Sequence, residues 1–263
     1  MKGIGNQLFP ESNQDGKMSL WQKEKSNPIS ILLLVHNEEK VIEKTILNFN
    51  SELRKHIRIQ IIVAEDGSTD GTKKILNKLS KRISMKLITS KKRKGYLKAT
   101  KDGLLQTNSE FVFITDTDGQ FIPSDFWKLY KERNNYDIVV GWKKNRADSP
   151  WRLIIAKAFH LLIRRIFDLP IHDPNTAFRI INKKVLDDIT AETRYLKYSF
   201  WTEFSVRAFK KSYTLKEIQI THKKRMNGKS QIYFHTKIPN MLLSQLLGLL
   251  KLWKSVRITK KSI

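Results

Sequence analysis

The stretch FVFITDTDGQF, residues 111–121, places two carboxylates one residue apart directly after an apolar run. Its first four residues have the composition of a buried strand. A parallel strand that ends in Asp116 and Asp118 carries both groups to the carboxyl edge of its sheet, where α/β proteins bind ligands. Paired carboxylates beside a phosphate suit Mg²⁺ or Mn²⁺. The same pattern also occurs in ordinary turns, so the surrounding sequence has to decide between the two interpretations.

Outward from this stretch, short apolar runs alternate with segments of helical spacing. Strands are expected at residues 29–35, 57–64, 85–89, 111–115 and 136–141. Helices are expected between them, at residues 41–49, 73–79 and 94–107 and after Pro123. Such alternation indicates βαβ units with right-handed crossovers. The sequence therefore predicts an α/β fold with a mostly parallel central sheet flanked by helices.

The composition is that of a folded and strongly basic chain. Its 263 residues, 40% of them hydrophobic, are enough for one domain with additions. The 50 Lys and Arg residues against 25 Asp and Glu residues give a net charge of +25. That charge attracts nucleic acid, anionic membranes or phosphorylated substrates, although a generally Lys-rich proteome would also produce it. Cysteine is absent, which excludes disulfides and fits a reducing compartment.

Two later segments are amphipathic and basic. Residues 151–167 are predicted to form a helix with Ile154, Ile155, Ala158, Leu162 and Ile166 on one side and Arg152, Lys157, His160, Arg164 and Arg165 on the other. Residues 238–250 carry no charge, are too short to span a bilayer and are followed by five cations, at 251, 254, 257, 260 and 261. Each segment fits either an interfacial membrane helix or a helix packed on the core. Residues 1–27 are polar, without a visible secretory signal, and are expected to be a flexible lead-in.

Three acidic loops follow predicted strands. They are residues 36–38 (HNE), 65–68 (EDGS) and 116–118 (DTD). Because parallel strands end at the same edge of a sheet, the three loops are expected to converge there.

With these loops in place, the chain resembles family 2 glycosyltransferases of the GT-A fold. The similarity is greatest to polyprenyl-phosphate sugar transferases such as dolichol-phosphate mannosyltransferase and its undecaprenyl-phosphate counterparts. It covers residues 29–230 and rests on five motifs in order: LVHNE at 34–38, EDGSTDGT at 65–72, DTDGQ at 116–120, DPNTAFR at 173–179 and RMNGKS at 225–230. The chain departs from the family pattern at Leu34, His36, Glu65, Lys143 and Ala177, where relatives carry Pro, Tyr, Asp, Arg and Gly.

The resemblance implies a role for each matched residue. The donor nucleotide sugar would be bound by His36, Glu38, Asp66, Gly67, Lys94, Asp116, Thr117, Asp118 and Gln120. Mg²⁺ or Mn²⁺ would be held by Asp116 and Asp118. The acceptor phosphate would be bound by Arg179, Arg225, Lys229 and Ser230, with Arg146 and Arg152 in second rank. Catalytic roles would fall to Asp116, Asp118, Arg179 and Glu203, the last by orienting Arg225 or acting as a base.

The implied activity is metal-dependent, inverting transfer of a sugar from a nucleoside-diphosphate sugar to undecaprenyl or dolichyl phosphate. The enzyme would be peripheral on an anionic membrane, at its cytoplasmic face. Residues 28–230 would form the GT-A domain, and residues 231–263 a basic amphipathic C-terminal helix and tail. A phosphate acceptor is largely dianionic at neutral pH and attacks without a base.

Three other functions are weighed against this one. A family 2 transferase that acts on a saccharide hydroxyl would keep the donor half and would need a base. A nucleic-acid-binding protein would explain the charge, but no helix-turn-helix, RRM or zinc motif is present in the sequence. An inactive, lipid-binding family member is disfavoured by the intact Asp116 and Asp118.

Overall fold

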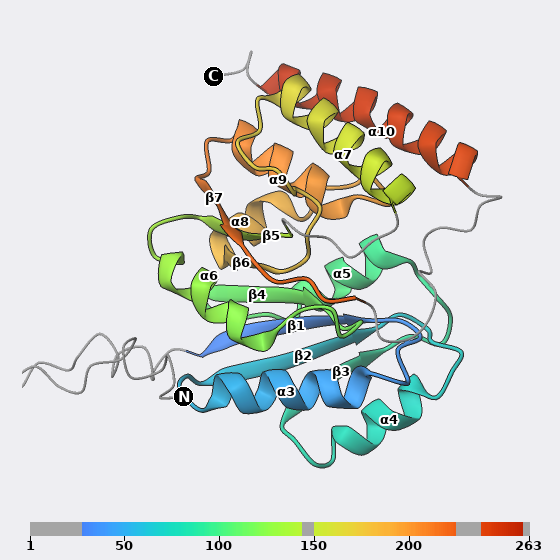
Figure 1. Cartoon of the computed structure of the whole chain (residues 1–263), viewed down its shortest axis with the longest axis vertical. Helices are drawn as coiled ribbons and strands as arrows, with labels where there is room; N and C mark the ends of the chain where they lie inside the picture. Colours follow the sequence, from blue (N-terminus) through green and yellow to red (C-terminus); the bar gives the residue numbers. More distant parts are fainter. Residues whose placement is uncertain (1–27, 144–149, 225–237, 260–263) are drawn as a thin grey trace, which may run out of the picture.

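The computed structural model describes residues 28–143, 150–224 and 238–259. Seven strands within these ranges form one sheet in the order β3-β2-β1-β4-β6-β5-β7 (Figure 1). The strands are β1 (Ile29–Val35), β2 (Ile59–Glu65), β3 (Met85–Thr89), β4 (Phe111–Asp116), β5 (Ile138–Trp142), β6 (Arg179–Asn182) and β7 (Leu215–Gln219). The five predicted strands are confirmed, with ends that shift by one or two residues.

The sheet is mostly parallel, as predicted. β1 pairs in parallel with β2 and β4, β2 with β3, and β5 with β7. β6 is antiparallel to both of its neighbours, β4 and β5. β6 and β7 were not predicted from the sequence. β6 has only four residues, and the half-exposed β7 (LKEIQ) carries charged residues at an edge of the sheet, so neither has an apolar run long enough to identify it.

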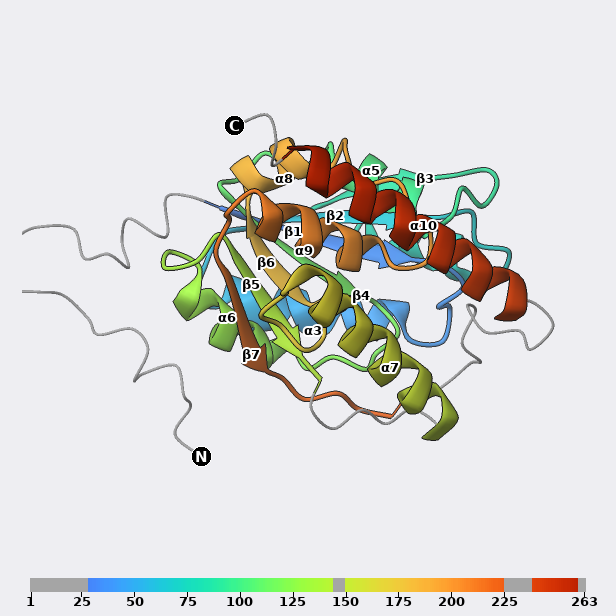
Figure 2. The ribbon, with the colours of Figure 1, turned by 90° about the horizontal axis from the view of Figure 1, so that it is seen from above.

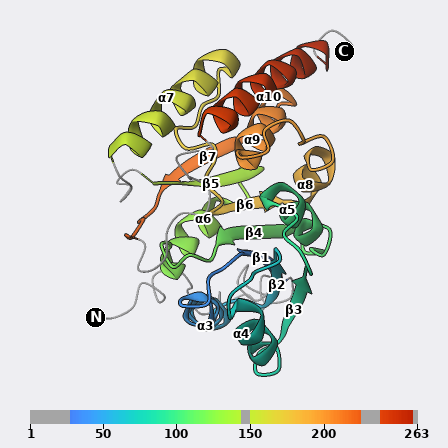
Figure 3. The ribbon, with the colours of Figure 1, turned by 90° about the vertical axis from the view of Figure 1, so that its right-hand side faces the viewer.

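Helices cover both faces of the sheet (Figure 3). One face carries α3 (Ile42–Arg54), α4 (Thr72–Leu79) and α6 (Phe126–Glu132), the last after a 3₁₀ turn at Pro123–Asp125. The other carries α5 (Tyr96–Leu104), α7 (Pro150–Phe167), α8 (Lys183–Ile189), α9 (Phe200–Lys210) and α10 (Ile238–Thr259). In β1, Ile31 and Leu33 pack into the first layer, and Leu32 and Leu34 into the second. Burial on both faces explains why β1 is apolar throughout.

α7 and α10 lie together at one end of the molecule (Figures 1 and 3). α10 packs against α9 through Leu249, Leu252 and Val256, which belong to the core. α7 reaches the same core through the buried Ile163 and Phe167. Ile154 and Leu162, on the predicted apolar face of α7, are exposed, so that part of the face does not pack on the core as one of the two alternatives expected.

The outward sides of α7 and α10 expose large apolar side chains. These are Ile154, Leu161 and Leu162 on α7, and Leu242, Leu243, Leu246, Leu247 and Leu250 on α10. Figure 2 shows both helices on the outer surface of the molecule, beyond α9. One side of α10 therefore packs on the core, and the other side presents exposed leucines. Of the helices in the described ranges, none has the length and hydropathy required to cross a bilayer.

Candidate active site

The three acidic loops meet at the carboxyl ends of β1, β2 and β4. The Asn37 amide N–H donates to Ser68 Oγ at 3.0 Å, and the Thr69 N–H donates to Asn37 Oδ1 at 2.8 Å. On the other side, Thr117 Oγ1 donates to the Leu34 carbonyl at 2.8 Å. The expected convergence of these loops is therefore present in the fold.

Asp66 and Gly67 hold the loop that precedes α5. The Asp66 carboxylate is buried and accepts N–H bonds from Lys94 at 2.6 Å and from Gly95 at 3.0 Å. Gly67 has φ of 64°, and a Cβ there would stand 2.3 Å from the amide nitrogen of Arg93. This turn therefore requires glycine, because any side chain would overlap the neighbouring backbone.

His36, Glu38 and Lys94 have different surroundings at this edge. Burial, and then the charge of Arg93, lowers the pKa of His36, so its half-buried ring is neutral at pH 7. The Glu38 backbone N–H donates to Thr72 Oγ1 at 2.9 Å. The Lys94 ammonium is engaged with Asp102 at 2.6 Å, which favours a structural role for this lysine over the expected donor contact.

Asp116 and Asp118 stand half-buried at the end of β4, and each accepts a hydrogen bond at Oδ1. The Tyr96 hydroxyl donates to Asp116 Oδ1 at 3.3 Å, and the Gln120 N–H donates to Asp118 Oδ1 at 3.1 Å. Burial, and then the charge of Asp116, raises the pKa of Tyr96 well above its ordinary value, so the hydroxyl keeps its proton. Two oriented, hard-oxygen carboxylates fit Mg²⁺ or Mn²⁺.

No group of three or more His, Cys, Asp or Glu residues suited to a metal ion occurs in the described part of the chain. A cation between Asp116 and Asp118 would therefore complete its coordination with oxygens from a ligand or from water. This matches the chemistry of Mg²⁺, which is usually bound by one or two carboxylates together with substrate phosphates.

The position of Arg179 does not fit its predicted catalytic role. Its side chain is fully buried, and its nitrogens donate to the carbonyls of Thr176 at 2.8 Å and Pro174 at 2.9 Å and to Ser205 Oγ at 3.1 Å. The guanidinium carbon lies 4.6 Å from the ring centroid of Trp201. Burial lowers the pKa of Arg179 to about 9, so it remains cationic at neutral pH. These contacts make it a support for the DPNTAFR loop rather than a phosphate ligand.

Glu203 is likewise fully buried and engaged. Its Oε1 accepts from Arg207 Nε at 2.9 Å and from the Arg194 N–H at 3.0 Å. Its Oε2 accepts from the N–H groups of Tyr195 at 2.6 Å and Leu196 at 2.7 Å. The carboxylate closes the loop before α9, so the structure assigns it a structural task in place of the expected base or partner of Arg225.

The other expected acceptor residues lie outside the described residues. These are Arg146, Arg225, Lys229 and Ser230, and the side chain of Arg152.

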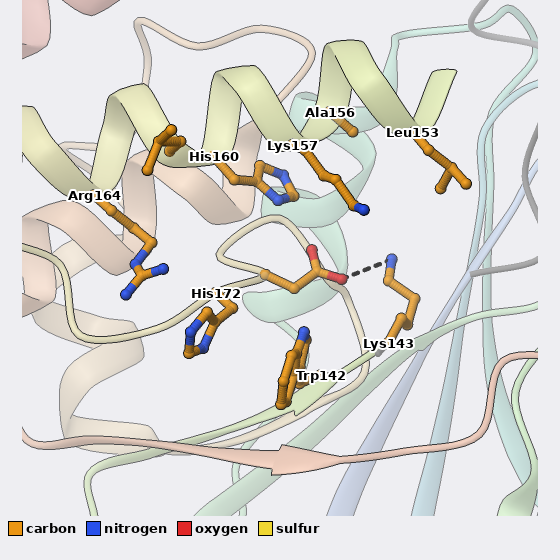
Figure 4. Close-up of a pocket in the computed structure, with 10 residues that line it drawn as sticks. Trp142, Lys143, Leu153, Ala156, Lys157, His160, Arg164 and His172 are labelled. Carbon is orange, nitrogen blue, oxygen red and sulfur yellow. Dashed lines mark ion pairs between the residues drawn. The ribbon is translucent and has the colours of Figure 1, made fainter. Parts of the chain in front are cut away.

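A basic cavity of about 590 Å³ lies between α7 and the end of β5 (Figure 4). Lys157, His160 and Arg164 reach into it from α7, and Lys143 lies on the opposite wall. The Lys143 ammonium is 3.4 Å from the buried Asp173 carboxylate. The sequence placed the three α7 residues on one side of a helix, but nothing in the pattern connected them with Lys143 or Asp173.

The floor of this cavity is aromatic. The rings of Trp142 and His172 stack with centroids 4.8 Å apart and an interplanar angle of 20°. Glu217 of β7 fixes the loop below them, because its Oε1 accepts the N–H groups of His172 at 2.8 Å and Asp173 at 2.7 Å. Lys143 also lies 6.0 Å from the ring centroid of Phe121, which follows the DTDGQ motif. The cavity is therefore adjacent to the loop that carries Asp118.

This fold and this edge of acidic loops define a glycosyltransferase of the GT-A fold. The model of the family described as "Glycosyl transferase family 2" matches residues 30–190, and the chain belongs to this family.

Two curated relatives are undecaprenyl-phosphate 4-deoxy-4-formamido-L-arabinose transferases. The chain is 24% identical over 219 residues to that of Pseudomonas syringae pv. syringae (strain B728a), covering 81% of this chain and 63% of the relative. It is 22% identical over 218 residues to that of Pseudomonas paraeruginosa (strain DSM 24068 / PA7), covering 81% and 62%. The chain thus spans less than two thirds of the length of these relatives.

Among solved structures, the chain resembles glucosyl-3-phosphoglycerate synthase from Mycobacterium tuberculosis. The complex of that enzyme with Mn²⁺, UDP and phosphoglyceric acid superposes with a TM-score of 0.69 at 16% identity, covering 93% of this chain and 84% of the other. At this identity the likeness concerns the fold.

Proposed function

We propose that this glycosyltransferase moves a sugar from a nucleoside-diphosphate sugar to a polyprenyl phosphate at the cytoplasmic face of a membrane. The relatives named undecaprenyl-phosphate sugar transferases support this acceptor class. The observation that carries the proposal is the basic cavity beneath α7, whose wall includes the exposed Leu161. A phosphate with a long apolar tail needs cations beside an apolar surface, and this part of the molecule offers both.

On the donor side, the proposal assigns the nucleotide to the edge formed by the three acidic loops. The neutral ring of His36 suits stacking on a base, and the carboxylate of Glu38 suits a ribose or base donor, whereas Asp66 is buried and positions the neighbouring loop through the Lys94 and Gly95 N–H groups. Asp116 and Asp118 would hold Mg²⁺ or Mn²⁺. When bound, the cation would supply Lewis-acid stabilisation of the departing nucleoside diphosphate.

On the acceptor side, the cavity replaces Arg179 as the proposed phosphate site. Lys143, Lys157 and Arg164 give it three cationic side chains against the single carboxylate of Asp173. They would hold the acceptor phosphate as a dianion, which is the dominant form above its second pKa of about 6. A phosphate oxygen then forms the new bond to the anomeric carbon as the bond to the donor diphosphate breaks, with inversion. No proton has to be removed from this nucleophile.

The exposed leucines of α7 and α10 provide the proposed membrane contact. Lys251, Lys254 and Arg257 follow them on α10 in the same helix. Basic residues beside a membrane-facing apolar helix attract anionic lipids, with about 1 kcal/mol for each cation near the surface.

The decisive experiment is transfer of label into lipid. The purified protein is incubated with Mn²⁺, undecaprenyl or dolichyl phosphate, and a panel of labelled nucleotide sugars, and label is measured in the organic phase. Metal-dependent, donor-selective labelling of lipid is expected. Omission of the lipid phosphate and addition of EDTA are the controls. Absence of labelled lipid with every donor contradicts the proposal.

One observation favours a second candidate, transfer to a saccharide hydroxyl. The cavity contains the Asp173 carboxylate beside the stacked Trp142 and His172. A carboxylate is the base that a hydroxyl acceptor needs, and aromatic rings suit sugar faces. The same assay separates the two, because nucleotide release driven by a saccharide, without labelled lipid, supports this alternative.

A further inference from the structure

A hydrogen-bond chain of fixed direction leads to Asp116 from the interior of the protein. The indole Nε1–H of Trp201 donates to the Tyr96 hydroxyl oxygen at 2.8 Å, and that hydroxyl lies 3.3 Å from Asp116 Oδ1. An indole N–H is a donor only, so the Tyr96 oxygen is the acceptor in the first bond. The single hydroxyl hydrogen is therefore directed to Asp116. Neither Tyr96 nor Trp201 belongs to a motif that the sequence analysis recognised.

Both ends of this chain are anchored. Trp201 is 1% exposed, lies under the Arg179 guanidinium, and packs edge-on against Phe200 with ring centroids 4.8 Å apart. Tyr96 follows Gly95, whose N–H is bound by the Asp66 carboxylate at 3.0 Å. The hydroxyl group is thus held from the core by α9 and from the sheet edge by the loop that Asp66 fastens.

We infer that Tyr96 is a positioning residue for the divalent cation site, because it fixes the carboxylate of Asp116 in the orientation that a metal–diphosphate complex requires. The inference rests on the proposed function, which assigns the cation to Asp116 and Asp118. Arg179 then acts indirectly, because its guanidinium stacks on Trp201 and holds the indole that donates to Tyr96. Hydrogen-bond partners of metal ligands set the orientation of those ligands and typically change metal affinity by about 10- to 100-fold.

The test is direct Mn²⁺ binding to Tyr96→Phe, measured as free Mn²⁺ by electron paramagnetic resonance with saturating UDP or GDP. This substitution keeps the ring and removes the hydroxyl. We expect Mn²⁺ binding to weaken by about 10-fold or more. Metal-free nucleotide binding, followed by calorimetry, is expected to stay within about twofold, because the change acts on Asp116 and not on the nucleotide loops. A general loss of structure would lower both affinities together.

Tyr213→Phe is the matched control. The Tyr213 hydroxyl also donates to an aspartate, Asp188, at 3.0 Å, but it does so on the surface at the end of α9. It is expected to bind Mn²⁺ as the unmodified protein does. Trp201→Phe, which removes the first donor together with part of the buried ring, is expected to weaken Mn²⁺ binding less than Tyr96→Phe does, because the Tyr96 hydroxyl remains.

Two results would overturn the inference, and only the second would also contradict the proposed metal dependence. Equal Mn²⁺ affinity of Tyr96→Phe and the unmodified protein would refute the positioning role and leave the metal site intact. No Mn²⁺ binding by the unmodified protein with either nucleotide would refute both this inference and the proposed metal dependence. Thermal melting of each variant shows that it is folded under the conditions of the measurement.

Discussion

Two pairs of charged residues, one in each half of the molecule, are held in opposite ways. In the half built on β1 to β4, Asp116 and Asp118 stand partly exposed at a strand end, and each accepts a hydrogen bond. In the half built on β5 to β7 and α7 to α10, Arg179 and Glu203 are fully buried and their polar atoms are engaged by the protein. A charged residue within a family motif can therefore be a ligand-binding group or a structural support, and its burial distinguishes the two. Asp66, in the first half, is also buried and braces the loop before α5, so the contrast is between Asp116 and Asp118 on one side and Arg179 and Glu203 on the other.

In the second half, the proposed binding groups come from a helix and a strand end that face each other across a cavity. Lys157 and Arg164 come from α7, and Lys143 follows β5, so the cavity depends on how a helix is laid over the sheet. The donor edge depends only on where parallel strands end. The proposed donor site is thus a product of strand topology, and the proposed acceptor site a product of helix packing.

The largest effect is expected from Asp118→Asn. Loss of this carboxylate removes a proposed cation ligand, and the cation stabilises the leaving diphosphate by several kcal/mol, so sugar transfer should fall by at least about a hundredfold. Initial rates at saturating donor and Mn²⁺ measure it. Asp187→Asn, on the exposed surface of α8 where the carboxylate pairs with Lys183, is the control. Near-normal activity of Asp118→Asn would remove Asp118 from the metal site.

Glu203→Gln tests whether the second half uses this charge for support. The change leaves the buried Arg207 without its buried anionic partner, so the free energy of unfolding should fall by about 3–5 kcal/mol. Glu192→Gln is the matched control, because Glu192 contacts the same Arg207 at 3.5 Å but is 44% exposed, and it should cost less than about 1 kcal/mol. Urea denaturation gives both values. A Glu203→Gln protein that is stable yet inactive would restore the catalytic interpretation.

Gly67→Ala probes the turn of the donor half. The new Cβ would overlap the backbone of residues 92 and 93 at 2.3 Å. Gly95→Ala is the comparison, since Gly95 also has positive φ, at 92°, but nothing lies within 4 Å of its added Cβ. Gly67→Ala should therefore lose about 1–3 kcal/mol more stability than Gly95→Ala. Equal losses in chemical denaturation would show that the turn adjusts to a side chain.

Arg164→Gln asks whether the cavity receives the acceptor phosphate. A hydrogen bond to a charged group contributes about 1.5–3 kcal/mol, so KM for polyprenyl phosphate should rise about tenfold or more, with KM for the donor unchanged. Arg165→Gln, at the next and exposed position of α7, should leave both values unchanged. An unaltered acceptor KM in Arg164→Gln would place the phosphate elsewhere.

The smallest effect is expected for a single leucine at the proposed membrane contact. The unmodified protein should sediment with anionic vesicles at low salt and be partly released at high salt, because salt screens the basic residues. Leu247→Ser should weaken vesicle binding by roughly fivefold, which corresponds to partial burial of one leucine. Leu105→Ser alters a leucine that is 77% exposed at the end of α5, and it should bind vesicles normally. Complete indifference to vesicles would contradict the membrane contact.

Most strands and loops of the first half were predicted from the sequence alone. An apolar strand that is buried on both faces is a continuous run, and its end is marked by the polar residues that follow it, so β1, β2 and β4 and their loops were identified correctly. Convergence of the loops follows from parallel pairing, whatever the details of packing. The same signals failed for β6 and β7, which are too short or too polar to stand out.

The sequence by itself determined the parallel sheet, the order of the motifs and the position of Asp116 and Asp118 at a strand end, because these depend on local periodicity and on strand direction. Only the tertiary structure decided that Arg179 and Glu203 are internal supports, that Tyr96 and Trp201 lead to Asp116, and that α7 closes a basic cavity with Lys143. The contacts of Tyr96 with Trp201 and Asp116 join residues far apart in the chain. Arg179 and Glu203 are engaged largely by residues near them in sequence, and their burial in the folded molecule is what makes them supports. Burial and long-range contact are properties of the packed whole, and no local pattern encodes which charged side chain faces inward.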